Sequence, residues 1–155
     1  MKFYNVAQGL VEKLKHENRV KIYYSDTDSY GIVWHGAYVK WFEMGRVELI
    51  NILGMDFNEF DALDIVLPVV ELNIRYKASS KIFDEVLIKT EIEELKPSSL
   101  TFKHTLINLT TNKPSVIATS TVVATSKDGK MYRKMPDVIY NKLLSALERD
   151  ELLNV

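Results

Sequence analysis

The sequence contains no cysteine, little glycine or proline, and almost no net charge. Its 155 residues include 6 glycines and 4 prolines, and the formal net charge at pH 7 is −1. Without cysteine, the chain has no disulfide, no thiolate nucleophile and no cysteine-ligated zinc. Its basic residues are scattered, which argues against a nucleic-acid partner held through phosphate contacts.

Long apolar runs are also missing. No stretch approaches the roughly 20 residues that a membrane-spanning helix needs. Charged residues break the N-terminal segment MKFYNVAQGLVEKLKHE too often for a signal-peptide core. We therefore expect a cytoplasmic protein without a membrane span. An ordinary hydrophobic share of 46%, at this length, predicts one domain that buries about 68–70% of its unfolded surface.

Alternating apolar and polar residues predict strands. Residues 18–24 alternate in this way, and so do four later segments, 69–77, 84–95, 99–110 and 115–126. The turn-forming sequences KPSS and TNKP separate the last three of them. After the first strand, apolar residues recur at helical spacing from His35 until Gly54 ends the pattern. Gly45 lowers helix propensity within this run, which predicts a close approach to a neighbouring backbone.

The remaining segments complete the expected fold. Residues 3–16 favour an N-terminal helix, residues 55–64 a loop, and Pro136 the start of a final short helix. We expect an arm or short helix over 1–16 and a single domain over 17–150. The element order predicts an α+β protein in which a five-stranded antiparallel sheet curls around the long helix. The sheet's open edges favour a dimer.

Residues 24–46, YSDTDSYGIVWHGAYVKWFEMGR, concentrate polar side chains before the long helix. A calcium loop is disfavoured, because an EF-hand would not place Tyr30 and Ala37 at its fifth and twelfth positions. Asp26, Asp28 and His35 could in principle hold a divalent cation, although no matching cluster lies elsewhere in the sequence.

A third interpretation pairs one carboxylate with the start of the helix. A helix N-terminus offers free backbone N–H groups and a partial positive charge. The N–H groups near His35 and Gly36 would polarise a carbonyl and hold the oxyanion formed on attack, so that acyl transfer needs no Ser-His-Asp triad. The structural alternative is that an Asp in a turn bonds its own backbone or caps the helix. This alternative is favoured for Asp26, and the two interpretations are evenly balanced for Asp28.

The same segment resembles the signature of hot-dog proteins of the 4-hydroxybenzoyl-CoA thioesterase type, including the short acyl-CoA thioesterases associated with the Tol-Pal system. The matching features are Tyr24, the D-x-D pair, Gly31, the Trp34–His35 pair and Tyr38. VVELNIRYKAS and KPSSLTF extend the likeness, which covers about residues 17–140. The segment before residue 17 is longer than usual, and KASSKIFDE is poorer in proline and aspartate than in many relatives.

This resemblance implies the hot-dog fold and hydrolysis of acyl-CoA thioesters without metal or other cofactor. It places the catalytic carboxylate on Asp28, and it implies supporting roles for His35 and Tyr24, which match the aliphatic acyl-CoA branch. Sites of this family lie at subunit interfaces, in homodimers that often pair into tetramers. Asp28 would either deprotonate water or attack the thioester directly.

Substrate contacts follow from the same assignment. We expect Tyr30, Trp34 and Tyr38 to line the acyl pocket, Phe42 to pack in the core, and a group of lysines to hold the CoA phosphates, in particular Lys77, Lys81 and Lys134. Glu43 offers a carboxylate on the helix, but with Asp28 present it is assigned a structural role.

The expected substrates are small to medium acyl groups on CoA, or on acyl carrier protein. Two alternatives stay open: a non-catalytic protein that binds acyl-CoA or acyl carrier protein, and a hot-dog dehydratase.

Overall fold

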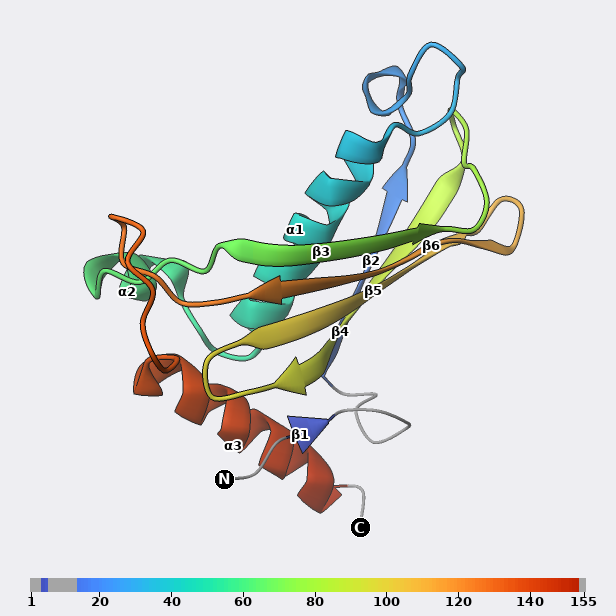
Figure 1. Ribbon diagram of the computed structural model, residues 1–155. Helices are drawn as coiled ribbons and strands as arrows, with labels where there is room; N and C mark the ends of the chain where they lie inside the picture. The colour runs from blue at the N-terminus through green and yellow to red at the C-terminus, as the bar shows by residue number, and fades with distance from the viewer. Residues whose placement is uncertain (1–3, 6–13, 154–155) are drawn as a thin grey trace.

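The computed structural model describes residues 4–5 and 14–153, and it is an antiparallel sheet with a long helix against one face (Figure 1). The strands are β1 Tyr4–Asn5, β2 Lys15–Lys21, β3 Val69–Tyr76, β4 Glu85–Leu95, β5 Leu100–Asn108 and β6 Lys113–Val122. The helices are α1 His35–Ile52, α2 Phe57–Ala62 and α3 Asp137–Leu153, with a 3-10 turn, η1, at Tyr24–Asp26.

The sheet runs β4-β5-β6-β3, and both β1 and β2 pair with the free side of β4. All of these pairings are antiparallel. The expected five-stranded sheet with its packed helix is therefore confirmed, and the two-residue β1 is added to it. Four of the expected strands were placed to within a few residues, because their alternation is regular.

The core lies between the sheet and α1. Every second residue of β4 is buried, including Val86, Ile88 and Ile92, while Lys89 and Glu91 point to the other face. The helical spacing predicted most of the buried face of α1, but it also placed Ile52 there, and Ile52 is 59% exposed at the end of the helix. The buried residues are Ala37, Tyr38, Trp41, Phe42, Gly45, Leu49 and Ile50. Burying these side chains is the main term that holds the helix on the sheet.

Gly45 lets α1 approach β4 closely. A Cβ added at this position would overlap the hydroxyl of Thr90 on β4. The close approach was predicted, but its neighbour is a side chain rather than a backbone. After Ile52 the helix ends, and Gly54 has the positive φ of +80° that favours glycine at this place.

The N-terminal helix expected over residues 3–16 is wrong wherever this segment is described. Tyr4–Asn5 pairs with Leu95 and Glu94, and Lys15 and His16 already belong to β2. The strand expected at 18–24 starts and ends three residues earlier, because η1 takes over at Tyr24. Pairing with β4 overrides the weak helical pattern here. Residues 1–3 and 6–13 of this expectation lie outside the described residues.

Two other segments complete the core. The loop expected at 55–64 contains α2, whose N-cap Asp56 accepts a hydrogen bond from the Asn58 N–H at 2.8 Å. The sequence signal was present, because Asp56 and Glu59 have the spacing of a capping box. Helix α3 follows Pro136 as expected, but it is 17 residues long and not the short helix predicted. Its buried residues Ile139 and Leu143 join the cluster under the end of the sheet.

Candidate active site

The segment between β2 and α1 is a short hairpin that returns to the start of the helix. The Asp28 N–H donates to the Ile32 carbonyl at 2.9 Å, and the Gly31 N–H donates to the Asp28 carbonyl at 3.0 Å. Gly31 has φ +77°, a conformation that glycine adopts without strain. The Trp34 N–H then donates to the Asp26 carbonyl at 3.1 Å. The backbone therefore fixes Asp28 relative to the first turn of α1.

The two aspartates of the D-x-D pair make similar local contacts. Asp26 Oδ2 accepts a hydrogen bond from the Tyr23 N–H at 3.0 Å, which is the turn-shaping contact expected for it. Asp28 Oδ1 accepts one from the Tyr30 N–H at 2.8 Å. Asp28 is exposed, and the part of the chain that the structure describes offers no further hydrogen bond to its second oxygen. One carboxylate oxygen of Asp28 is thus open to solvent or a ligand.

The first turn of α1 has no side-chain cap. Its N-cap is Trp34, which has no capping hydroxyl or carboxylate, and the Ala37 N–H bonds the Trp34 carbonyl at 3.1 Å. Among the described residues, nothing accepts a hydrogen bond from the N–H groups of His35 and Gly36. His35 is exposed and lies edge-on to Trp34, 5.5 Å between ring centroids. The helix therefore presents two free donors and its positive end next to the hairpin.

A groove of about 330 Å³ opens beside this helix start. Its lining residues come from the hairpin, from α1 and from the end of β3: Ile32, Val33, Tyr38, Tyr76, Lys77, Ala78 and Ser79. Tyr38 thus stands where the acyl pocket was expected. Tyr30 and Trp34, which are 87% and 43% exposed on the hairpin, are not among the residues that line this groove.

Behind the groove lies a buried polar network that the sequence did not reveal. Asn108 Nδ2 donates to Ser80 Oγ at 3.0 Å and to Asp84 Oδ2 at 2.9 Å, and Asp84 is only 4% exposed. Ser80 and Ser115 hydrogen-bond the Tyr38 hydroxyl, and burial raises the pKa of that phenol. The network therefore holds the Tyr38 hydroxyl at the groove wall, while burial favours the neutral phenol. Only the pairing of distant strands could have disclosed it.

The expected lysine group is not assembled within one chain. Lys77 lines the groove, and the backbone of Lys81 forms an isolated antiparallel β-bridge with Ile32 of the hairpin. Lys134 belongs to the segment between β6 and α3, at the opposite end of the sheet (Figure 1). Tyr24 is 75% exposed, with its ring edge-on to Phe83 at 5.7 Å between centroids.

A second imidazole, His104, lies in the core and not in the groove. Its Nε2 is 2.9 Å from Ser120 Oγ and its Nδ1 is 3.2 Å from Thr90 Oγ1. The arrangement resembles a nucleophile, base and orienting group, but Ser120 is fully buried and burial lowers the pKa of His104 to about 3. Such an imidazole is a poor general base at neutral pH. Phe42 stacks on it at 4.7 Å, in the core as expected.

No group of three or more metal-ligating side chains occurs among residues 4–5 and 14–153. Within the same ranges, no helix is long and apolar enough to cross a membrane. Glu43 lines a second groove of about 290 Å³ with Arg46, against α2 and the start of β3.

Comparisons with known proteins identify the family and the fold. Residues 23–143 match the thioesterase-like superfamily. The chain is 34% identical over 129 residues to a "Putative esterase" of Synechocystis sp., with 83% of this chain and 78% of that protein covered. It is 30% identical over 89 residues to the acyl-CoA thioester hydrolase YbgC of Escherichia coli O6:H1, covering 57% and 66%. The structure matches a DHNA-CoA thioesterase of Staphylococcus aureus with a TM-score of 0.78 at 24% identity, covering 90% and 93%.

Proposed function

This chain is a thioester hydrolase of the thioesterase-like superfamily, and we propose that it cleaves acyl-CoA with Asp28 as the reactive carboxylate. One observation carries the proposal. An exposed carboxylate lies on a hairpin whose backbone is hydrogen-bonded to the uncapped start of a helix, beside a groove. A carboxylate and free N–H donors are the groups that acyl transfer requires.

In this mechanism the thioester carbonyl lies over the start of α1. Its oxygen accepts hydrogen bonds from the N–H groups of His35 and Gly36, which stabilise the negative charge of the tetrahedral intermediate. Asp28 either takes a proton from the attacking water or adds to the carbonyl carbon itself. In both routes the C–S bond breaks and CoA leaves as the thiolate, which then takes up a proton. In the second route water hydrolyses the resulting mixed anhydride.

His35 and Tyr24 complete the proposed site. Both side chains are exposed on the segment that carries Asp28. We assign them the positioning of the thioester, with His35 next to the reacting carbonyl and Tyr24 toward the CoA side. The groove volume supports small to medium acyl groups, with Tyr38 in its wall. Acyl carrier protein is the alternative carrier.

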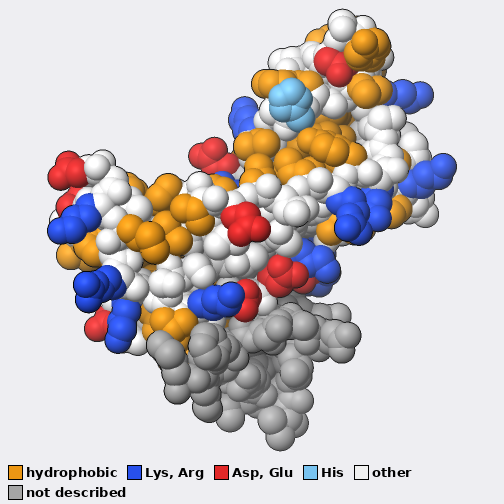
Figure 2. Space-filling view, in the orientation of Figure 1, with side chains coloured by type: hydrophobic (Ala, Val, Ile, Leu, Met, Phe, Trp, Pro, Cys, Tyr) orange, Lys and Arg blue, Asp and Glu red, His pale blue; other side chains and the backbone are white. Residues whose placement is uncertain are grey.

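A second copy of the chain is proposed to cover β3. Leu72 and Tyr76 pair with the buried Ser120 and Val116, so they lie on the α1 side of the sheet. They are nevertheless 39% and 55% exposed, and Figure 2 shows hydrophobic side chains gathered where α1 meets this strand. An edge strand with exposed apolar residues favours association. The proposed assembly is a homodimer, with pairing of dimers as its extension.

The direct test replaces Asp28 by Asn and measures CoA release with a thiol reagent across short, long and aromatic acyl-CoAs. Asn keeps an oxygen to accept the Tyr30 N–H, so the fold should be retained. Turnover should fall by roughly 10²–10⁴-fold or more. Asp26→Asn is the matched control, because it makes the same neutralising change two residues away in a turn contact.

Wild-type turnover in Asp28→Asn would remove Asp28 from the mechanism. Saturable acyl-CoA binding by the wild-type protein without release of CoA would instead favour a non-catalytic binding protein.

A further inference from the structure

An exposed cluster of a lysine and two aromatic rings adjoins the proposed site. The Phe83 ring is 56% exposed and Tyr24 packs edge-on against it. Lys21 Nζ lies 5.6 Å from the centroid of the Phe83 ring. Lys81 lies in the same loop as Phe83, between β3 and β4. Among the described residues, neither Lys21 nor Lys81 forms an ion pair. We call Lys21, Tyr24 and Phe83 the aromatic platform.

Phe83 is held outward by a strained backbone. Its φ of +66° is rare for a bulky residue. The conformation is fixed by the Phe83 N–H, which donates to the Ile22 carbonyl at 2.8 Å, and by the buried Asp84, which accepts from the Lys81 N–H at 3.0 Å and from Asn108. Burying a ring would explain such strain, but this ring faces solvent. Strain that places an apolar group outward indicates a role in binding.

The platform is rigidly connected to the reactive hairpin. The Val33 N–H donates to the Ser80 carbonyl at 2.9 Å, and Ile32 bridges to Lys81. The Ile22 N–H donates to the Asp84 carbonyl at 2.9 Å, which ties β2 to the same loop. The 77–84 segment therefore lines the groove with its first residues and carries Phe83 of the platform near its end. A ligand that occupies both would be held at a fixed offset from Asp28.

We propose that the aromatic platform binds the adenine nucleotide end of acyl-CoA. This inference rests on the proposed function. The adenine base stacks on the ring of Phe83, which Tyr24 supports edge-on, and Lys21 and Lys81 face the phosphates. Aromatic faces bind any base by stacking, and lysines bind phosphate as point charges. An anionic lipid surface fits less well, because the exposed carboxylates of Asp28 and Glu85 lie at the same end.

The test compares two substrates that carry the same acyl group. Hexanoyl-CoA has the nucleotide, and hexanoyl-N-acetylcysteamine has only the thioester end. Phe83→Gly removes the ring and accommodates the positive φ, so it should fold at least as well as the wild type. The KM for hexanoyl-CoA should rise roughly 5- to 100-fold, the scale of one base–aromatic stack. Its kcat, and both constants for the short thioester, should change little.

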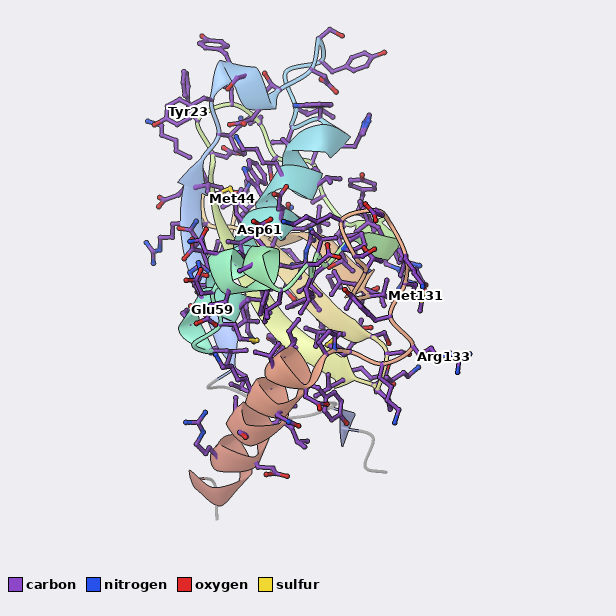
Figure 3. The ribbon with its side chains drawn as sticks, turned by 90° about the vertical axis from the view of Figure 1, so that its left-hand side faces the viewer. Tyr23, Met44, Glu59, Asp61, Met131 and Arg133 are labelled. Carbon is purple, nitrogen blue, oxygen red and sulfur yellow. The ribbon has the colours of Figure 1, made fainter. Side chains whose placement is uncertain are left out.

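Three further variants sharpen the result. Phe83→Tyr keeps a stacking face and should restore the KM. Lys21→Gln should raise the KM for hexanoyl-CoA less, and mainly at low salt, as expected for a surface charge. Met131→Ala removes another exposed apolar side chain, 55% exposed, and Figure 3 shows it well away from Tyr23, the neighbour of Tyr24. This control should behave as the wild type.

An equal effect of Phe83→Gly on both substrates would overturn the proposal, because the ring would then only shape the loop. A change of oligomeric state in this variant would also overturn it, since the platform would be a protein contact. If the wild-type protein hydrolyses neither thioester, the proposed function fails and the platform is tested alone with adenosine 3′,5′-bisphosphate by calorimetry. Binding that Phe83→Gly weakens supports the platform, and no binding to the wild type refutes it.

Discussion

Acid should destabilise this fold through His104, and the surroundings of the imidazole set the size of the effect. The ring is fully buried, stacks on Phe42 and has its two nitrogens next to the hydroxyls of Thr90 and Ser120. Burial lowers its pKa to about 3, and the positive charge of Arg46 acts in the same direction. His104 is therefore neutral in the folded protein down to acidic pH.

The magnitude follows from linkage between protonation and folding. In the unfolded chain the imidazole has an ordinary pKa of about 6.5, so below that pH the unfolded state binds a proton that the folded state does not. The free energy of unfolding then falls by about 1.4 kcal/mol for each pH unit. Between about pH 6.5 and 4.5 His104 alone should remove roughly 2 kcal/mol, a large part of a typical stability of ~5–15 kcal/mol.

Urea unfolding at several pH values measures this contribution. His104→Gln keeps a polar side chain facing Ser120 but cannot titrate. Its stability at pH 7 should be lower by about 1–3 kcal/mol, because hydrogen bonds and packing are imperfect. Its slope against pH should be shallower than that of the wild type, by about 1.4 kcal/mol per unit over this window. Ile88→Val, a buried neighbour, should lower stability without changing the slope.

Parallel curves for the wild type and His104→Gln between pH 6.5 and 4.5 would refute this reasoning. The imidazole would then titrate alike in both states, and its burial between α1 and the sheet would carry no penalty for charge.

Two further predictions concern packing and assembly. Gly45→Ala should lower stability by about 1–3 kcal/mol despite better helix propensity, because its Cβ would overlap Thr90. Adding Thr90→Ala should recover part of the loss in chemical denaturation, and additive losses would contradict the contact. Leu72→Glu places a charge on the exposed inner side of β3 and should shift sedimentation velocity from dimer to monomer. An unchanged dimer would place the interface elsewhere.

Local patterns identified most of the secondary structure. The alternation of residues 84–95 is regular because one side of β4 is buried and the other is polar. The spacing of apolar residues in α1 is regular for the same reason. The patterns were weaker where burial is slight, as in β2, none of whose residues is fully buried. Thus β2 was displaced by three residues, β1 was taken for helix, and α2 was missed although Asp56 signals its start.

The candidate site was also predictable where it depends on residues close in the sequence. Asp28 and the start of α1 are seven residues apart, so the sequence alone could bring them together through a single turn. Their hydrogen bonds lie within this one hairpin. The catalytic roles of Asp28, His35 and Tyr24, and the binding of CoA, stay predictions for the experiments above.

By itself, the sequence determined the helix, four of the strands and the segment that carries the reactive carboxylate, because these depend on contacts a few residues apart. Only the tertiary structure brought Asp84 to Asn108, His104 to Ser120, and the Phe83 loop to the hairpin. The residues of each pair are far apart in the sequence, and they meet because of the register between strands and the path of a loop. The spacing of neighbouring residues does not encode either of these. The lysines show the same limit: Lys77 and Lys81 share a loop, while the fold sets Lys134 at the far end of the sheet.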